Sequence, residues 1–536
     1  MPSNHQESMN KTIGQVVDGV ATRYPNNMAL VHPDSGTRHD YQRFLSEINR
    51  ASRGMMSLGI QKGDRVALWA PNVAEWIICQ IALAKIGAIL VPIDHGAGKE
   101  DLAYILEQSG SRSLIMTSGL AGDEYLKILS DMDHSSSPEQ VIVIDNQSHP
   151  GMISWGKLTE KGDETHMKAL DEREREIDAS DPVAIMYTSG TTGKPKGVIL
   201  DHVGLVNKSL FSALRQGLNN HDRLCLFFPL FHMFGNTCIT MAGLIQGASI
   251  IMPCETFEPS KILKAIDTEG CTAIYGSPSM LIALIDHPEF DPVRWRTLRK
   301  GTIGGAPCPV EVMRRLVEDI GVSDITVAYG ITEASSWITM TRPDDPLDRR
   351  VSTIGTPLEC NEVKILDPAT GDDLPPNTPG ELCTRGFLMK GYYRMPAATA
   401  SAIDRDGWFH SGDLGMMDEE GYVKITGRLK DVIVRDGHEI YPSELEETLY
   451  RAPGVSEVQV FGFPHPERGH EVAAWIKPKE GEGVSTEGLV QFAKENLSEE
   501  KQPHYFKVVT EFPMTRSGKV QKFRLAEMAK KEYLKS

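Results

Sequence analysis

Short runs of β-branched residues alternate with amphipathic helical patterns in this chain up to about residue 355. The clearest examples are predicted strands at 248–252 and 272–275, which precede predicted helices at 259–269 and 278–286. This alternation is typical of α/β units around a largely parallel sheet. Two more predicted strands, at 302–303 and 325–329, run directly into the loops GGAPCP and YGITEAS. Ligands of open α/β sheets bind where loops leave the carboxyl ends of strands, so these loops are candidates for a site.

The pattern changes beyond residue 355. Predicted strands at 363–366, 381–385 and 422–426 indicate a smaller β-rich subdomain. From Gly427 a third pattern predicts a compact α+β module, with helices at 443–450 and 486–496 and strands at 455–463, 471–478 and 507–512. The 536 residues also exceed what a single hydrophobic core usually supports. We therefore predict an α/β chain with an N-terminal domain (1–427), a hinge (428–432) and a C-terminal domain (433–536).

Composition and charge narrow the functional class. A net charge of −17 disfavours nucleic acid as a partner, because binding a polyanion requires clustered Lys and Arg. The eight cysteines form no CxxC pair, and the N-terminus has no apolar signal core, so we expect a cytoplasmic protein with reduced thiols. The longest apolar stretch, 76–93, includes Lys85 and Pro92, which disfavour a transmembrane segment. It predicts a buried helix, a turn at Gly87 and a strand.

The strongest local signal is YTSGTTGKPKG at 187–197, directly after a predicted buried strand. Its glycines, hydroxyls and lysines could surround a polyphosphate with N–H groups and positive charge. A Walker A loop requires GxxxxGK followed by Ser or Thr, and neither Lys194 nor Lys196 is followed by either residue. A flexible surface turn explains eleven residues of this composition poorly.

Five blocks in this order resemble the adenylate-forming superfamily of acyl-CoA synthetases, firefly luciferases and peptide-synthetase adenylation domains. They are YTSGTTGKPKG (187–197), YGITE (329–333), GWFHSGDLG (407–415), GRLKD (427–431) with DGHEIYPSELE (436–446), and PMTRSGKVQKFR (513–524). The resemblance runs from about residue 20 to the C-terminus and is nearest to medium-chain fatty acyl-CoA synthetases. It implies stacked α/β sheets and a β-rich subdomain in the large domain, followed by a small mobile lid.

The resemblance also implies the nucleotide site. The residues that would bind ATP or AMP are Thr188, Ser189, Gly190, Thr191, Thr192, Gly193, Lys194, Lys196, Gly305, Ala306, Pro307, Tyr329, Gly330, Thr332, Asp413 and Arg428. Of these, Tyr329 would stack on adenine, Thr332 would bind the α-phosphate, and Asp413 would accept from the ribose hydroxyls with help from Arg428. Glu333 would hold Mg²⁺, a cation suited to carboxylate and phosphate oxygens.

The catalytic steps are implied in the same way. Lys519, in SGK, would bridge the substrate carboxylate and the α-phosphate as a positive charge. Lys430 would be the hinge about which the small domain swings, so that the 436–442 loop replaces the lysine loop. Gly437 and His438 would then approach coenzyme A. This loop departs from the family's more usual GGENIYP, because Asp436, His438 and Glu439 replace Gly, Glu and Asn.

The acyl pocket is the part that the sequence specifies least. The resemblance places His232, Phe234, Gly276, Ser277, Gly304 and Ile331 along it. Trp337, just after the TE pair, would shorten it and favour a medium-chain or ring acid.

The predicted function is an acyl-CoA synthetase that uses ATP, Mg²⁺ and coenzyme A, and a homodimer is left open. Three alternatives remain: a ligase that loads the phosphopantetheine of a carrier protein, a luciferase-like oxidation of the adenylate, and an inactive acyl-nucleotide binding protein. The first predicts a basic docking surface, and ATP–pyrophosphate exchange tests the last.

Overall fold

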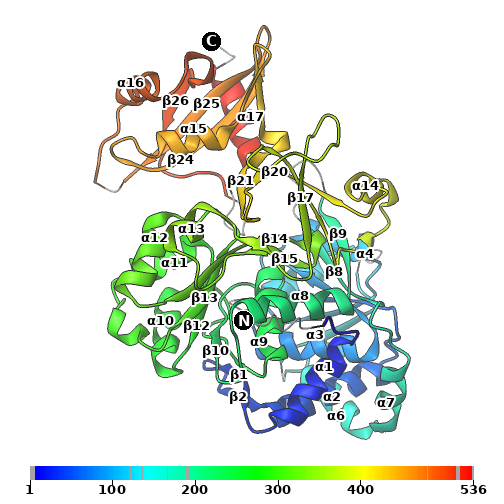
Figure 1. The fold of residues 1–536 in the computed structure, drawn as a ribbon. Helices are drawn as coiled ribbons and strands as arrows, with labels where there is room; N and C mark the ends of the chain where they lie inside the picture. The colour runs from blue at the N-terminus through cyan, green and yellow to red at the C-terminus, as the bar shows by residue number, and fades with distance from the viewer. Residues whose placement is uncertain are drawn as a thin grey trace. The chain divides into compact units, whose positions relative to one another are not determined.

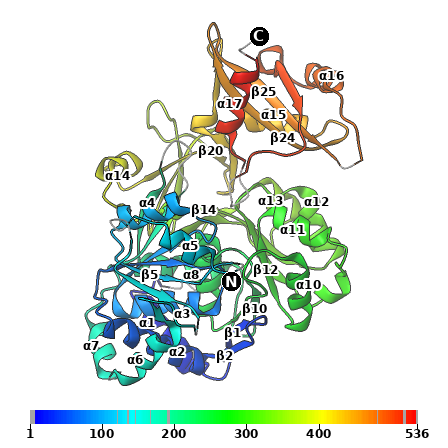
Figure 2. The same cartoon turned by 180° about the vertical axis from the view of Figure 1, so that it is seen from behind.

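The computed structural model describes residues 7–120, 122–133, 137–145, 147–165, 167–188, 194–479, 481–514 and 520–533. The chain divides into two compact units. The first contains the residues up to Gly190, Lys194–Val363 and Thr384–Phe409, and the second contains Lys364–Cys383 and the chain from His410. Figures 1 and 2 show the ribbon from opposite sides.

Two mixed sheets form the framework of the first unit. The nine-stranded sheet has the order β16-β15-β14-β13-β12-β10-β11-β1-β2. Its strands are, in chain order, β1 (Met28–His32), β2 (Thr37–Asp40), β10 (Arg223–Cys225), β11 (Ser249–Ile251), β12 (Ala273–Gly276), β13 (Lys300–Gly304), β14 (Asp324–Ile331), β15 (Ser336–Met340) and β16 (Thr356–Pro357). From β1 through β14 the neighbouring strands are parallel, as the α/β pattern predicts.

The eight-stranded sheet has the order β19-β9-β8-β4-β3-β5-β6-β7. Its strands are β3 (Arg65–Trp69), β4 (Ile89–Ile93), β5 (Ser113–Met116), β6 (Gln140–Val143), β7 (Ile153–Ser154), β8 (Pro182–Thr188), β9 (Lys196–Asp201) and β19 (Gly391–Tyr392). The apolar stretch at 76–93 is a buried helix, a left-handed Gly87 and strand β4, so this prediction is confirmed.

Helices connect the two sheets through one large core. The helices of this layer are α1 (Ile13–Arg23), α2 (Tyr41–Ser57), α3 (Ala74–Ile86) and α8 (His202–Arg215). Helix α3 is apolar on every side, and nearly all of its residues are buried, as expected for a helix covered on all faces. A second core lies under α10 (Pro259–Thr268), α11 (Pro278–Ile285), α12 (Val310–Arg314) and α13 (Leu347–Ser352), which Figure 2 shows grouped beside β12.

The second unit contains a four-stranded and a five-stranded sheet. The first has the order β17 (Glu362–Leu366), β18 (Gly380–Arg385), β20 (Phe409–Met417) and β21 (Val423–Arg428). Strands β17 and β20 begin in residues of the first unit, and β18 ends in them. The second has the order β23-β22-β25-β24, with β26 beside β25. Its elements are β22 (Ile433–Arg435), β23 (His438–Ile440), α15 (Pro442–Leu449), β24 (Val455–His465), β25 (Gly469–Pro478), α16 (Thr486–Asn496), β26 (Tyr505–Val508) and α17 (Lys522–Tyr533).

One predicted strand is wrong in its bounds. The sequence predicts a strand at 507–512, but β26 spans Tyr505–Val508. The register explains the shift, because Tyr505 pairs with Ala473 of β25 and its ring lies 5.3 Å from that of Phe463. Tertiary packing of an aromatic residue decides where this strand begins.

Candidate active site

The backbone is strained where β14 turns into β15. A short 3₁₀ turn, Thr332–Ala334, is followed by Ser335 and Ser336, whose φ angles are 57° and 137°. Residues other than glycine rarely adopt positive φ, and such strain is often retained at functional sites. Ser336 Oγ lies 2.9 Å from Cys238 Sγ, in the buried interior. The sequence predicted a site at this loop but gave no indication of the strain.

Glu333 is held by a residue that sequence reasoning missed. The Tyr392 hydroxyl donates to Glu333 Oε1 at 2.8 Å, and the Met389 N–H donates to the Glu333 carbonyl at 2.8 Å. Burial, and then the nearby Glu333, raise the pKa of Tyr392 well above its ordinary value. The Tyr392 hydroxyl therefore remains a hydrogen-bond donor. No local motif marks Tyr392, because its importance comes from a contact across 59 residues.

Lys196 lies against the same tyrosine. Its Nζ is 4.6 Å from the centre of the Tyr392 ring, within range of a cation–π interaction. Lys194 lies similarly over Tyr104, at 4.9 Å. Thr188 and Lys196 are partners in the antiparallel β8–β9 ladder, so the ends of the predicted phosphate loop are adjacent. The predicted residues Ser189, Gly190, Thr191, Thr192 and Gly193 lie outside the described residues.

The second unit brings Asp413 and Arg428 together. They are partners in the β20–β21 ladder, and Arg428 Nε lies 2.9 Å from Asp413 Oδ1. Asp413 is buried, whereas Arg428 is exposed. Lys430 follows in the 3₁₀ turn Leu429–Asp431, where burial, and then Arg428, lower the pKa of its side chain. Lys519 lies outside the described residues.

The unusual 436–439 segment has a structural explanation. Asp436 and Gly437, with φ of 52° and 83°, form the turn between β22 and β23, whose flanking residues Arg435 and His438 pair. Positive φ at both central residues is the type I′ geometry, for which Asp-Gly is a favoured sequence. Arg468 Nε lies 3.7 Å from Asp436 Oδ2, so the additional carboxylate has a cation beside it.

Three of the predicted acyl-pocket residues are in contact. The Phe234 and Trp337 rings meet edge to face with centroids 4.9 Å apart. A Cβ atom on Gly304 would lie 2.6 Å from Trp337 Cη2, so only glycine leaves room for this indole. Trp337 therefore occupies the space next to the carboxyl end of β13.

The remaining predicted residues lie at the ends of strands or in the segments that follow them. Tyr329, Gly330 and Ile331 end β14, and Gly276 ends β12. The Ser277 hydroxyl accepts from the Met280 N–H and caps α11, which is a structural role. His232 Nδ1 accepts from the Phe234 N–H at 3.1 Å. Gly305, Ala306 and Pro307 are exposed in the loop after β13.

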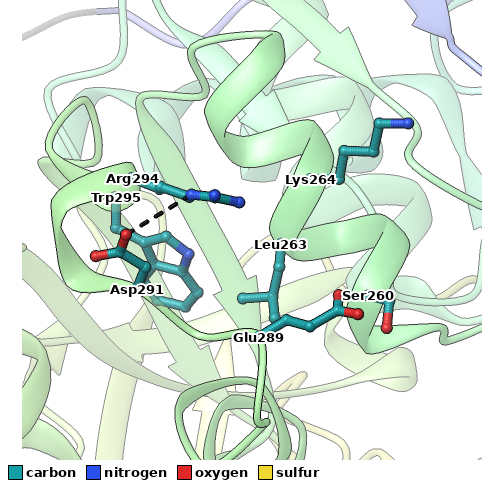
Figure 3. Close-up of a pocket in the computed structure, with 7 residues that line it drawn as sticks. All are labelled: Ser260, Leu263, Lys264, Glu289, Asp291, Arg294 and Trp295. Carbon is teal, nitrogen blue, oxygen red and sulfur yellow. Dashed lines mark ion pairs between the residues drawn. The ribbon is translucent and has the colours of Figure 1, made fainter.

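A separate surface pocket lies beside α10 (Figure 3). It is lined by Ser260, Leu263, Lys264, Glu289, Asp291, Arg294 and Trp295. Positive and negative side chains are mixed there, and Arg294 lies 3.7 Å from Asp291. None of the predicted site residues lines this pocket, so it is distinct from the candidate site.

Comparison with known proteins identifies the class. A family profile described as AMP-binding enzyme matches residues 17–393, and one described as AMP-binding enzyme C-terminal domain matches residues 444–519. ATP-bound MatB from Rhodopseudomonas palustris has a similar structure, with a TM-score of 0.86 and 26% identity over 98% of this chain and 100% of that chain. Fold and loops together define an adenylate-forming enzyme.

The curated relatives are acyl-CoA ligases by name. YngI of Bacillus subtilis (strain 168), named as an acyl-CoA synthetase, is 41% identical over 97% of both chains. The mitochondrial medium-chain acyl-CoA ligase ACSF2 of Bos taurus is 35% identical over 97% of this chain and 87% of that protein. This chain belongs to the AMP-binding enzyme family. It is an AMP-forming acid–thiol ligase: ATP and a carboxylic acid give acyl-AMP, and coenzyme A then takes the acyl group as a thioester.

Two further observations concern the whole chain. All eight cysteines lie among the described residues, and none of them is in a disulfide there. Among the described residues, no helix has the length and apolar character needed to cross a membrane.

Proposed function

We propose that this enzyme activates a medium-chain or ring carboxylic acid. The packing of Trp337 against Gly304 and Phe234 carries the proposal, because a buried indole beside the predicted pocket limits the length of an acyl chain. The name of the Bos taurus relative, a medium-chain ligase, supports the same substrate class.

The test is a panel of short, medium, long and ring acids with ATP, Mg²⁺ and coenzyme A, in which AMP and acyl-CoA are followed by mass spectrometry. We expect the highest kcat/KM with medium-chain or ring acids. Trp337→Ala should move the optimum towards longer chains, because it removes the largest side chain of the predicted pocket. An unchanged chain-length profile in Trp337→Ala would remove the support for this substrate class.

The acid's carboxylate would attack the α-phosphorus of ATP, and pyrophosphate would leave. Because phosphoryl chemistry of this kind depends mainly on positioning and charge neutralisation, we assign most site residues to these tasks. We assign Lys194 and Lys196 with the 188–193 loop to the β- and γ-phosphates, and Thr332 to the α-phosphate. Lys519 would stabilise the charge that develops between the substrate carboxylate and the phosphate.

Three more groups would bind the nucleotide and its metal. Tyr329 would stack on adenine, and the Asp413 carboxylate would accept from the ribose hydroxyls. The carboxylate of Glu333 offers the hard oxygen donors that Mg²⁺ prefers. The Tyr392 hydroxyl holds Oε1 of this carboxylate in place, so the residues present fit the ion. When bound, Mg²⁺ would neutralise phosphate charge.

For the second half-reaction we propose residues 433–536 as a lid that turns about a hinge at 428–432. The thiol of coenzyme A would then attack the acyl carbonyl of acyl-AMP, with AMP as the leaving group. The exposed Asp436-Gly437 turn and His438 would lie beside the pantetheine arm, where a glycine allows close approach. We also propose a cytoplasmic location. A homodimer stays a prediction that light scattering tests.

The sequence alone leaves open a ligase that loads a carrier protein, but the relatives named as acyl-CoA ligases favour coenzyme A as the acceptor. In the same assay a carrier-protein ligase would give AMP and acyl-AMP but no acyl-CoA, and a phosphopantetheinylated carrier would become acylated. Absence of ATP–pyrophosphate exchange with every acid would instead favour an inactive acyl-nucleotide binding protein.

A further inference from the structure

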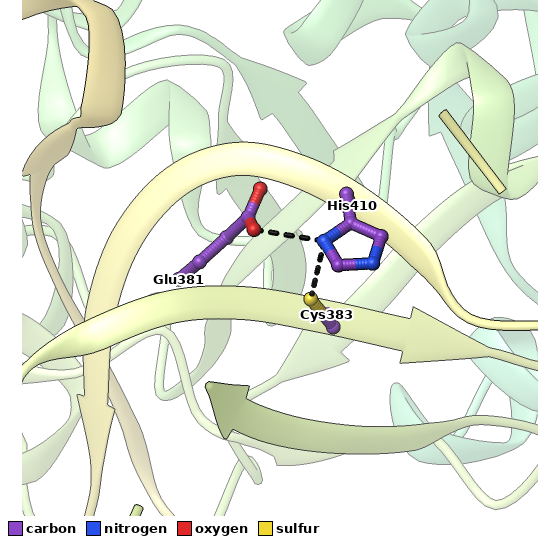
Figure 4. A group of neighbouring side chains, drawn as sticks. All are labelled: Glu381, Cys383 and His410. Carbon is purple, nitrogen blue, oxygen red and sulfur yellow. Dashed lines mark hydrogen bonds and ion pairs between the residues drawn. The ribbon is translucent and has the colours of Figure 1, made fainter. Parts of the chain in front are cut away.

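Three side chains of the second unit meet beside the part of strand β20 that leads to Asp413. Figure 4 shows Glu381 and Cys383 of β18 pointing towards His410 of β20. His410 Nδ1 lies 2.8 Å from Glu381 Oε2 and 3.5 Å from Cys383 Sγ. Among the residues that the structure describes, this is the one His/Cys/Glu cluster in which all candidate ligand atoms lie within 4.8 Å of one another.

Both carboxylate oxygens of Glu381 accept hydrogen bonds from the 410–412 segment. Oε2 accepts from His410, and Oε1 accepts from the Gly412 N–H at 3.0 Å. Because a carboxylate accepts, Nδ1 of His410 carries the proton. Glu381 is only 8% exposed, so water replaces these bonds poorly when they are lost.

Ser411, in the same segment of β20, is also tied to β18. The Ser411 hydroxyl donates to the Leu382 carbonyl at 2.6 Å and accepts from the Asp413 N–H at 3.0 Å. Gly412 adopts a left-handed φ of 69°, which directs the chain from this anchor into Asp413. Arg428 holds the Asp413 carboxylate from the neighbouring strand β21. The Asp413 carboxylate is thus positioned from β18 through its backbone and from β21 through its side chain.

We propose that Glu381 is a positioning residue for nucleotide binding, which acts through His410 and Gly412 on the orientation of Asp413 towards the ribose hydroxyls. This inference rests on the proposed role of Asp413 and adds the residue that holds it.

The same three donors could also serve a transition metal, since Cys, His and Glu are its usual ligands. The hydrogen bonds favour positioning, because both oxygens of Glu381 and the proton on Nδ1 are already used in bonds to His410 and Gly412. A metal would have to displace these bonds. Metal binding is therefore the alternative outcome of the test.

The experiment compares ATP with 2′-deoxy-ATP and 3′-deoxy-ATP in pyrophosphate exchange at saturating acid. If Glu381 acts through Asp413, Glu381→Gln should raise the KM for ATP about tenfold or more, the range for a hydrogen bond to a charged group. The deoxynucleotides, which lack a hydroxyl for Asp413, should be affected less, so discrimination against them should fall. The KM for the acid should stay within about twofold. Glu457→Gln, which removes an ion-pair carboxylate elsewhere in the same unit, is the matched control and should change none of these values.

The variant Asp413→Asn distinguishes the ribose-binding role of Asp413 from the positioning role of Glu381. If it leaves discrimination at the wild-type level, the ribose assignment of Asp413 fails, and the inference falls with it. If Asp413→Asn removes discrimination but Glu381→Gln lowers the use of all three nucleotides equally, Glu381 supports only the fold, and the inference alone is overturned.

A second variant and a dialysis experiment complete the test. If Glu381→Gln does not fold, His410→Phe removes the Nδ1–H donor at the other end of the same link and should reduce discrimination in the same direction. Dialysis of the wild-type enzyme against EDTA should leave discrimination unchanged. A loss on dialysis that Zn²⁺ restores would overturn positioning in favour of a metal site.

Discussion

Tyr392 contacts two residues that the sequence assigns to nucleotide binding. Its hydroxyl donates to Glu333, and its ring lies under Lys196. The two contacts depend on different parts of the side chain, so they can be removed separately.

We expect Tyr392→Phe to lower the rate of adenylation about fivefold to tenfold, because one hydrogen bond to a carboxylate is lost while the ring under Lys196 remains. The measurement is ATP–pyrophosphate exchange as a function of Mg²⁺ concentration, in which the variant should require more Mg²⁺. Tyr393→Phe is the matched control, since the next tyrosine contacts Arg394 instead. Equal Mg²⁺ dependence in both variants would show that Tyr392 does not influence Glu333.

Because of His202, we expect the free energy of unfolding to fall in acid. This histidine is fully buried at the start of α8, and its Nδ1 accepts from the Ile13 N–H that opens α1. Burial is the main cause that lowers the pKa of His202 to about 4.

The folded-state pKa is below the unfolded value near 6.5, so the unfolded chain binds the proton first as pH falls. The contribution of His202 is therefore fully present above pH 6.5 and is lost as pH falls to about 4. It amounts to at most about 3 kcal/mol. Urea unfolding of the wild type and His202→Asn between pH 4 and 7 measures it, because the other titrating groups cancel. The difference in unfolding free energy should shrink as pH falls, and a constant difference would contradict the argument.

The residues that the sequence identified and those that it missed differ in how their roles arise. Glu333, Asp413 and Arg428 stand in contiguous motifs, so their roles follow from local strings of letters. Tyr392 and Glu381 act through contacts 59 and 29 residues away, respectively, and no periodicity or spacing encodes such contacts. Only the folded chain identifies them.

At the scale of elements, side chains of helix α8 bond to backbone carbonyls near one edge of the nine-stranded sheet. Strand β16 pairs only with Thr339 and Met340 of β15. Lys208 of α8 lies 3.4 Å from the Trp337 carbonyl and also bonds to Asn361, and Arg215 donates to the Met340 carbonyl at 2.8 Å. Long cationic side chains thus bond to carbonyls of β15 at and beyond its short pairing with β16.

Burial lowers the pKa of Lys208 to about 8, since its charged form loses water and gains neutral partners. Between pH 8 and 10.5 the unfolded chain holds more protons, so this lysine makes unfolding free energy rise with pH. We expect the wild type to gain up to about 3 kcal/mol relative to Lys208→Met across this window. Denaturant unfolding of both proteins measures the difference. A difference that stays flat with pH would mean that the ammonium is solvated or paired.

Element prediction worked where burial or amphipathicity produces a pattern. The helix, Gly87 turn and strand at 76–93 follow from an apolar run that contains a single glycine. The π-helical segment Phe234–Met241 has no such signal, because all eight residues are buried and no polar face marks its period. The strained Ser335-Ser336 turn is likewise invisible, since serine does not predict positive φ.

At the scale of the whole molecule, the proposed two-step reaction requires the lid to adopt two arrangements. The 3₁₀ turn Leu429–Asp431 joins β21 to β22, and in sequence it lies between the Asp413–Arg428 pair and the Asp436-Gly437 turn. A change of φ and ψ in a few residues of such a connection is enough to reorient a domain.

Lys430→Pro tests this requirement. Proline fixes φ near −65° and disfavours the helical region at Leu429, so the turn has fewer conformations available. We expect the variant to retain one half-reaction and to slow the other, which changes the ratio of pyrophosphate exchange to acyl-CoA formation at least tenfold. Lys430→Ala is the control: it removes the side chain but leaves φ free, so the ratio should stay within about twofold. If proline slows both half-reactions equally, residue 430 is structural and not a hinge. If it slows neither, the lid turns about another residue.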